Sequence, residues 1–368
     1  MSAVAPVRVL IVDDSATVRA VLRRLLDRDP GIEVAGEASD GAQAVEATLR
    51  FRPDVVLMDI EMPGTDGYTA IERIMTLRPT PILVLTSRAT RDHARTAFEA
   101  IRRGALEVVP KPADTIGWEE LAASLPLTVR AIATARLPAP PAPGDRRPAL
   151  EALVAAARPA VATARPRPPA AWPAPAAAIR YIAVGASTGG PTAVRELIAA
   201  LPAVIPASVL VVQHIAAGFE GSFVEWLGAE LQRSTRVAVD GECPHAGDVR
   251  VAPPGAHLAL GADGLLHLDS ASPPRRGHRP SADDLFRSCA RAFPRATVGV
   301  LLTGMGSDGA EGLAELRRAG GVTVVQDEAS SIVFGMPRAA LECGAAETAL
   351  PPAAIGAALG RCFMGLLR

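Results

Sequence analysis

The stretch "YIAVGASTGGPTAV" (Tyr181–Val194) decides how the second half of this chain is interpreted. An apolar run typical of a buried strand ends in a serine set among glycines, and a segment with helical character follows it. Ser187 in this setting has three interpretations: a nucleophile, part of a phosphate-binding loop, or the N-cap of the helix. The rest of the chain is needed to choose between them.

Strand-like and helix-like segments alternate on both sides of a stretch rich in proline and alanine. Before it, the runs "VRVLIV", "DVVLMDI", "PILVLTS" and "ALEVVPKP" predict strands, and "WEELAASLPLTVRAIA" predicts a closing helix. After it, strands are predicted in "YIAVGAS", "SVLVVQH", "TVGVLLTG" and "VTVVQ", and a β-hairpin in "HLALGADGLLHL", with Asp263 and Gly264 at the turn. The alternation predicts two α/β domains with parallel sheets, the first doubly wound and the second Rossmann-like with three layers.

The stretch between the two alternating regions sets the expected domain boundaries. We expect a first domain at 6–136, a linker at 137–178 and a second domain at 179–368. The linker segments "LPAPPAPGDRRP" and "RPRPPAAWPAPAAA" cannot build a core, although "ALEALVAAAR" between them could form a short helix. Where proline dominates, such a linker is semi-extended.

Composition excludes several classes of protein. A hydrophobic content of 49% with 21% charged residues is typical of a globular protein, and the net charge of -1 gives no basic footprint for nucleic acid. No uncharged apolar run reaches the roughly 20 residues of a membrane span, and the N-terminus lacks a signal-peptide pattern. The four cysteines form no C-x-x-C pair, which indicates reduced thiols and no zinc site. We therefore expect a cytoplasmic protein without membrane insertion or a nucleic-acid partner.

Acidic side chains follow two predicted strands of the first domain. Asp13 and Asp14 end the first strand, and Asp59 ends "VVLMDI". Ligands of open α/β sheets bind at the carboxyl ends of strands, and three carboxylates there suit Mg2+. Thr86 and Lys111 end two further strands and offer the hydroxyl and the ammonium that a phosphoryl group on one carboxylate would need.

Each of these residues also has a simpler interpretation. Asp13 or Asp14 could cap the next helix, and Lys111 could be an ordinary surface residue. However, Lys111 is the one lysine among 38 basic residues, and it lies between two prolines at a strand end. That choice favours a site that needs a compact point charge.

The motifs "VDDS", "MDIEMPGTDG", "LTS" and "PKP", in this order, resemble the receiver domain of two-component response regulators. The resemblance implies that Asp59 is the phosphoacceptor and that Asp13 and Asp14 hold Mg2+ together with it. It also implies that Thr86 reads the phosphoryl group and that Lys111 pairs with it.

The same resemblance implies a histidine kinase as the phosphodonor. One position departs from the family pattern. Receivers commonly carry an aromatic switch residue three positions before the lysine, and here that position is Val108. The departure concerns how phosphorylation is relayed rather than whether it occurs.

The setting of Ser187 is compatible with catalysis. "GASTG" has the G-x-S-x-G spacing of a nucleophile elbow, and the same region has the spacing of a dinucleotide loop with serine in the middle. A dinucleotide site needs a carboxylate near the end of the next strand, which here ends in Gln213 and His214. The dinucleotide interpretation is therefore rejected, while the helix cap stays open.

A serine nucleophile needs a histidine base oriented by a carboxylate. Only His214 directly ends a buried strand run, and Asp308 lies in a glycine-rich loop after a third such run. The alternative role for Asp308 is the N-cap of the helix "GAEGLAELRRAG", and it can do both. The other histidines lie in the first domain, on the hairpin or in loops rich in proline and glycine: His93, His257, His267, His245 and His278.

A tetrahedral intermediate needs N–H donors for its oxyanion. We expect the backbone amides of Thr188, directly after the serine, and Met305, in the Asp308 loop, to supply them. The chain order Ser, His, Asp differs from that of α/β-hydrolases and predicts another scaffold.

Residues 179–368 resemble the catalytic domain of chemotaxis protein-glutamate methylesterases, the CheB family. The resemblance rests on "GASTGGP", "VVQHI", "VAPPGAHL", "GHRPSADDLF", "LLTGMGSDGA" and "DEASSIVFGMP". It implies that Ser187 is the nucleophile, that His214 is the general base and then the acid, and that Asp308 orients His214. A receiver ahead of this domain completes the family's architecture.

The resemblance further implies a glutamate methyl ester on the cytoplasmic helices of chemoreceptors as substrate, with deamidation of glutamines as a second activity. No cofactor is implied for the esterase. Phosphorylation of Asp59 should raise activity, and one hypothesis is that the unphosphorylated receiver covers the Ser187 cleft. Deleting residues 1–136 would then raise the basal rate, and no increase would contradict that hypothesis.

Two other classes of function stay open: a non-catalytic receiver-linked signalling module, and an esterase with the same mechanism acting on another protein. Replacing Ser187 with alanine separates the first from an esterase, because a binding module would keep its function. A transcription factor is disfavoured, since no helix-turn-helix pattern or basic patch follows the linker.

Overall fold

The computed structural model describes residues 5–87, 98–112, 114–135, 137 and 178–366. The chain divides into two compact units, which we describe separately. The predicted linker lies outside the described residues except at its two ends, and so do its predicted short helix, at 149–158, and His93. No helix among the described residues is both long enough and apolar enough to span a bilayer.

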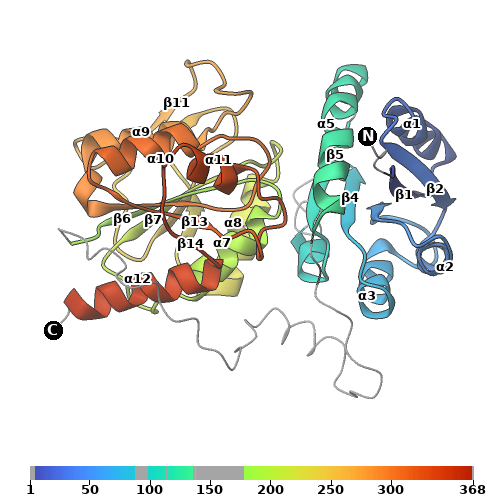
Figure 1. The fold of residues 1–368 in the computed structure, drawn as a ribbon, viewed down its shortest axis with the longest axis horizontal. Helices are drawn as coiled ribbons and strands as arrows, with labels where there is room; N and C mark the ends of the chain where they lie inside the picture. Colours follow the sequence, from blue (N-terminus) through green and yellow to red (C-terminus); the bar gives the residue numbers. More distant parts are fainter. Residues whose placement is uncertain (1–4, 88–97, 113, 136, 138–177, 367–368) are drawn as a thin grey trace. The chain divides into compact units, whose positions relative to one another are not determined.

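The first unit is a five-stranded parallel sheet in the order β2-β1-β3-β4-β5 (Figure 1). The strands are β1 (Val7–Val12), β2 (Ile32–Ala38), β3 (Val55–Met58), β4 (Ile82–Ser87) and β5 (Glu107–Lys111). The described helices are α1 (Ala16–Leu26), α2 (Gly41–Phe51), α3 (Gly67–Leu77) and α5 (Thr115–Ala133). α1 packs with α5 and α2 packs with α3, so the sheet is doubly wound as predicted.

Polar caps determine where the helices of the first unit begin. The side chains of Ser15, Asp40, Asp66 and Asp114 each accept a hydrogen bond from a backbone N–H in the first turn of the helix that follows. Such bonds satisfy donors that an α-helix leaves unpaired. The order of the strands reverses between β1 and β3, and the carboxyl ends of strands at such a reversal are where open α/β sheets bind their ligands.

The second unit is a seven-stranded parallel sheet in the order β14-β13-β12-β6-β7-β9-β8. Its strands are β6 (Tyr181–Ala186), β7 (Ser208–Gln213), β8 (Thr235–Val237), β9 (Val249–Val251), β12 (Thr297–Leu301), β13 (Val322–Gln326) and β14 (Ala349–Leu350). All residues of the central strands β6, β7 and β12 are buried, because helices cover both faces of the sheet.

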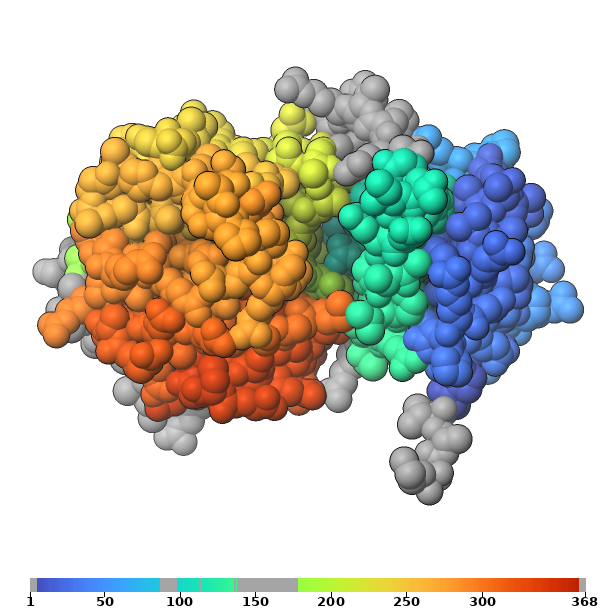
Figure 2. Space-filling model, turned by 90° about the horizontal axis from the view of Figure 1, so that it is seen from above, coloured from blue at the N-terminus to red at the C-terminus, as the bar shows by residue number. Residues whose placement is uncertain are grey.

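The helices of the second unit form two layers around the sheet, as Figure 1 shows. One layer contains α9 (Ala282–Ala292), α10 (Ala310–Arg318) and α11 (Met336–Glu342), and the other contains α7 (Gly190–Ala199), α8 (Glu220–Leu231) and α12 (Pro352–Leu366). The predicted three-layer arrangement is confirmed. The predicted hairpin is confirmed as well, by β10 (His257–Leu260) pairing antiparallel with β11 (Leu266–Asp269). In the space-filling view, the chain from β8 to α9 (yellow to orange) forms a continuous part of this unit's surface (Figure 2).

Candidate functional site

The three predicted triad residues lie at the ends of three adjacent strands of the second unit. Ser187 follows β6, His214 follows β7, and Asp308 lies in the loop after β12. The strand order reverses between β12 and β6, which is where open α/β sheets form a crevice. The structure therefore gathers residues from three distant parts of the sequence at one edge of the sheet.

The loop after β6 leaves Ser187 half-buried and does not use its side chain as a helix cap. The Ser187 amide donates to the Thr303 carbonyl (3.0 Å), and the Ser187 carbonyl accepts from the Gly190 amide (2.7 Å). The N-cap of α7 is Gly189, whose φ of 74° lies in the left-handed region, and no side chain caps this helix. The interpretation of Ser187 as the helix N-cap is therefore wrong, because the turn places the cap two residues later.

The buried side chain of Gln213 joins the serine loop to the histidine loop. Its Nε2 donates to the carbonyl oxygen of Ser187 (2.8 Å) and to that of His214 (2.9 Å). The His214 amide also donates to the Ala186 carbonyl (2.9 Å). These bonds fix the backbone on which the predicted nucleophile and base are carried.

His214 and Asp308 form a buried hydrogen-bonded pair. His214 Nε2 lies 2.8 Å from Asp308 Oδ2, and the two side chains are only 10% and 1% exposed. Because a carboxylate only accepts hydrogen bonds, Nε2 carries the proton and Nδ1 is the acceptor. Nδ1 is buried and has no hydrogen-bond partner within the described structure. The predicted base role of His214 would require this nitrogen to take the proton of Ser187, and that role stays a prediction.

Asp308 is held by the N-terminus of α9. Its carboxylate accepts from Ser281 Oγ (2.6 Å) and from the amides of Ala282 (2.7 Å) and Asp283 (3.3 Å). Burial alone would raise the pKa of Asp308, but the bond and charge of His214 and the bonds from Ser281 and Ala282 lower it to about 2. The N-cap of α10 is Gly309, without a side-chain bond, so the expected cap of that helix by Asp308 is wrong. Asp308 instead supplies acceptors to a helix that is distant in sequence.

The two amides predicted for the oxyanion lie in loops that approach each other closely. Neither the Thr188 amide nor the Met305 amide donates a hydrogen bond within the described residues. The carbonyl of Thr188 is fixed by Thr303 Oγ1 (2.9 Å). A Cβ on Gly304 would lie 2.7 Å from the Cβ of Ser187, so only glycine permits this approach. The oxyanion role of the two amides stays a prediction.

Sequence reasoning missed four residues that build this site: Gln213, His278, Ser281 and Thr303. The ring of His278 stacks on the ring of His214, with centroids 3.8 Å apart. Gln213, His278 and Thr303 gave no local signal, because each contacts a group of the site that is distant in sequence. Ser281 before an acidic helix start was the one local signal, since serine is a preferred N-cap residue.

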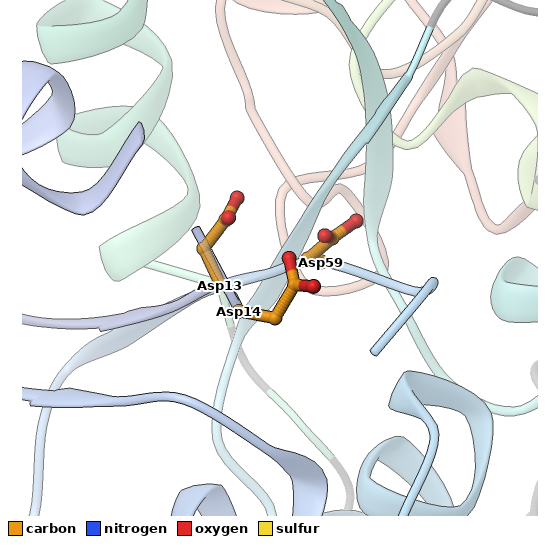
Figure 3. Close-up of side chains that lie close together, drawn as sticks. All are labelled: Asp13, Asp14 and Asp59. Carbon is orange, nitrogen blue, oxygen red and sulfur yellow. The ribbon is translucent and has the colours of Figure 1, made fainter. Parts of the chain in front are cut away.

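In the first unit, the acidic residues predicted to hold Mg2+ lie together (Figure 3). Oxygen atoms of Asp13, Asp14 and Asp59 are all within 4.8 Å of one another, and Asp14 is the exposed member. Three carboxylates with an open side toward solvent fit a hard divalent cation that keeps several water ligands. The donor set is thus suited to Mg2+.

Lys111 is buried against this cluster rather than on the surface. Its ammonium lies 2.7 Å from Asp13 Oδ2 and 2.8 Å from Asp59 Oδ2, and its side chain is 13% exposed. Burial works against the charge of Lys111, but its bonds to the two carboxylates raise its pKa above the ordinary value. The surface interpretation of Lys111 is wrong. The cap interpretation of Asp13 and Asp14 is also wrong, because Ser15 caps α1.

The two remaining receiver positions lie on neighbouring strands. Thr86, near the end of β4, is 1% exposed, and its Oγ1 has no hydrogen-bond partner within the described structure. A buried hydroxyl without a partner is costly, which favours a site that a ligand oxygen completes. Val108 is half-buried on β5 opposite Val84 of β4.

We expect Asp59→Asn to stabilise the first unit at neutral pH. Burial raises the pKa of Asp59, despite Lys111, and the charge of Asp13 raises it further. The pKa of Asp59 is then higher in the folded chain than in the unfolded chain. Folding stability therefore falls as the pH rises between the unfolded and the folded pKa, and the loss of stability is complete above the folded pKa. Removing the charge should raise the unfolding temperature of the first unit by about 4 °C. The measurement is calorimetry at pH 7 without Mg2+.

Addition of Mg2+ provides the complementary measurement. Binding to the folded state alone raises stability by mass action, so Mg2+ should raise the transition of the wild-type chain more than that of Asp59→Asn. Asp27→Asn, at an exposed position after α1, is the matched control and should behave like the wild type. If Asp59→Asn unfolded at a lower temperature than the wild type without Mg2+, the buried charge of Asp59 would not be destabilising and the prediction would be wrong.

Comparisons with known proteins match both parts of the chain. The CheB methylesterase family matches residues 182–359, and the response regulator receiver domain family matches residues 9–121. A protein-glutamate methylesterase/protein-glutamine glutaminase of Symbiobacterium thermophilum is 41% identical over 97% of this chain and 97% of its own length. Protein-glutamate methylesterase/protein-glutamine glutaminase 4 of Geobacter metallireducens is 42% identical over 96% of this chain and 98% of its own length.

One solved structure is also similar to part of the chain. The crystal structure of the Thermotoga maritima CheB methylesterase catalytic domain is 34% identical, covers 50% of this chain and 99% of that chain, and has a TM-score of 0.48. The two curated relatives, by contrast, match nearly the full length of the chain at more than 40% identity. The chain therefore belongs to the family of CheB methylesterases that carry a receiver domain.

Proposed function

We propose that this chain hydrolyses glutamate methyl esters on the cytoplasmic helices of chemoreceptors, with release of methanol, and that phosphorylation of its receiver regulates this activity. The observation that carries the proposal is the buried His214–Asp308 pair at the strand ends next to Ser187. The curated relatives are named protein-glutamate methylesterase/protein-glutamine glutaminase, which supports both the ester and the amide as substrates. The chain acts in the cytoplasm, where the receptor helices and the kinase are found.

In the first half of the reaction, His214 Nδ1 takes the proton of the Ser187 hydroxyl as the oxygen attacks the ester carbonyl. The amides of Thr188 and Met305 stabilise the oxyanion. The intermediate collapses when His214 gives the proton to the departing methoxide, which leaves as methanol. Asp308 stays ionised throughout, because its pKa of about 2 keeps it a carboxylate at neutral pH.

In the second half, water hydrolyses the glutamyl ester of Ser187. His214 Nδ1 takes a proton from the water, whose oxygen attacks the acyl carbon, and returns it to Ser187 Oγ as the acyl bond breaks. The product is a free glutamate side chain. A glutamine side chain follows the same route, with ammonia leaving in place of methanol.

In the first unit, Asp59 accepts a phosphoryl group from a histidine kinase. A bound Mg2+ would be held by Asp13, Asp14 and Asp59 and would neutralise part of the phosphoryl charge. Lys111 pairs with one phosphoryl oxygen, and the buried Thr86 hydroxyl gains a hydrogen-bond partner, which it lacks among the described residues. Phosphorylation thus redistributes the bonds that Lys111 makes with Asp13 and Asp59.

The test is methanol release from methylated receptor membranes, with and without a small phosphodonor and Mg2+. We expect the phosphodonor to raise the rate of the wild-type chain and to leave the rate of Asp59→Asn unchanged, because an amide cannot accept the phosphoryl group. Asp27→Asn should be stimulated like the wild type. Stimulation that persists in Asp59→Asn would contradict the phosphoacceptor assignment.

The same measurement separates the alternative substrates. If wild-type Asp59 is phosphorylated but receptors release no methanol, the esterase acts on another protein or the chain is a non-catalytic module. Release from receptors that also occurs in a chain with Ser187 replaced would contradict the serine mechanism.

A further inference from the structure

A tight turn at Arg275–His278 lies beside the predicted triad of the second unit. The amide of Arg275 donates to the His278 carbonyl (2.9 Å), and the amide of His278 donates to the Arg275 carbonyl (2.8 Å). Between them, Arg276 and Gly277 have φ values of 49° and 85°, as in a type I′ turn. The side chain of Arg275 makes a bidentate ion pair with Asp284 of α9. The turn is therefore tied to the helix whose N-terminus holds Asp308.

The ring presented by this turn covers one face of the predicted base. The imidazoles of His278 and His214 are stacked, with centroids 3.8 Å apart and planes 5° from parallel. The bond to Asp308 fixes only the Nε2 edge of the His214 ring. A ring stacked at contact distance adds a restraint on the tilt of the whole plane, and so on the direction of Nδ1.

His278 presents a neutral ring to His214 at neutral pH. Its pKa is lowered to about 4, first by burial and then by the charge of His214, against the opposite effect of Asp308. His214 and Asp308 are the titratable groups that act on it. The stack is therefore a contact between the neutral ring of His278 and the ring of His214.

We propose that His278 is a positioning residue for the general base. Its ring holds the plane of the His214 imidazole and so directs Nδ1 for the transfer of the Ser187 proton. This inference rests on the function proposed above, because it concerns the same proton transfer. It predicts that the aromatic ring at position 278 matters and that its nitrogen atoms do not.

The test compares His278→Ala with His278→Phe in the full chain, as the rate of methanol release from methylated receptors. We expect kcat of His278→Ala to fall by about 10- to 100-fold with KM within about twofold, because a misdirected base slows the chemical step. His278→Phe keeps the stack and should stay within about fivefold of the wild type. His245→Ala, at a histidine whose side chain is 80% exposed, is the matched control.

Two kinetic outcomes would overturn the proposal. His278→Ala within twofold of the wild type would show that the stack is unnecessary. A folded His278→Phe as slow as His278→Ala would show that His278 acts through its nitrogens instead.

A spectroscopic test works whether or not receptors are the substrate. In the chain labelled with 15N-histidine, the His278 ring signals, assigned by their loss in His278→Phe, should stay those of a neutral imidazole down to about pH 5, as the pKa of about 4 requires. The Nε2 proton of His214 should exchange with water faster in His278→Ala than in the wild type. Unchanged exchange would overturn the proposal. Titration of His278 near its ordinary pKa of about 6.5 would overturn it as well, because the ring would then not be buried against His214. Failure of methanol release in the wild-type chain would instead count against the proposed function.

Discussion

Ser187→Ala is expected to reduce methanol release by about 10,000-fold or more, because loss of a serine nucleophile leaves only binding and oxyanion stabilisation. The folded state should be nearly unchanged, since the loop after β6 is held by backbone bonds of Ser187 and by the Gln213 side chain. The measurement is kcat/KM on methylated receptors in the presence of phosphodonor.

Two controls make the Ser187→Ala result specific. Ser270→Ala, at an exposed position after the hairpin, should have wild-type activity. Phosphorylation of Asp59 should be unaffected in Ser187→Ala, because the receiver contains all the residues proposed for it. Activity of Ser187→Ala within tenfold of the wild type would rule out the serine as nucleophile.

Asp308→Asn is expected to lower kcat by about 1,000- to 10,000-fold at neutral pH, as replacements of the triad carboxylate do in serine proteases. An amide can donate to Nε2, which would shift the His214 proton to Nδ1 and remove the acceptor for the Ser187 proton. Asp240→Asn is the matched control, because the Asp240 carboxylate is exposed and the Oδ1 of asparagine can still accept from Leu268. Unchanged kcat would contradict the triad.

The same substitution changes how stability depends on pH. The pKa of Asp308 is lowered from 3.8 to about 2 in the folded chain. A depressed pKa contributes stability that is complete above the unfolded value, near pH 4, and is lost as the pH falls toward 2. That contribution is about 2 kcal/mol. The free energy of unfolding of the second unit should therefore fall less steeply between pH 4 and 2 in Asp308→Asn than in the wild type. An identical slope in both chains, measured by denaturant titration, would contradict the assignment.

Much of the fold could be predicted because the central strands are continuous apolar runs. β1, β6, β7, β12 and β13 all lie in segments that the sequence marks as buried. Turn and cap chemistry located the hairpin. Because parallel strands place their carboxyl ends at one edge, the polar residues after these runs could be grouped into two sites before their contacts were known.

The strands that went unpredicted lack such a signal. β2 carries two glutamates and a glycine, while β8, β9 and β14 have three residues or fewer. These segments become strands because a neighbouring strand offers a partner, which periodicity cannot reveal.

The roles of individual polar residues depended on contacts across the fold. Asp308 lies just before α10 in sequence, yet its bonds go to the start of α9. Likewise, no local pattern relates His278 to His214 or Gln213 to Ser187. Local chemistry therefore located the site, while tertiary packing decided which groups serve it.

The Gln213 amide has a consequence for how this site tolerates change. Adjacent strands of a sheet are rotated relative to one another, so a change in that twist would change the spacing of their ends. Because its Nε2 donates to the carbonyls of both Ser187 and His214, Gln213 holds the ends of β6 and β7 together. The spacing of nucleophile and base is thereby insulated from the surrounding loops. Changes in the length or composition of those loops should therefore leave the distance between the Ser187 and His214 backbones unaltered.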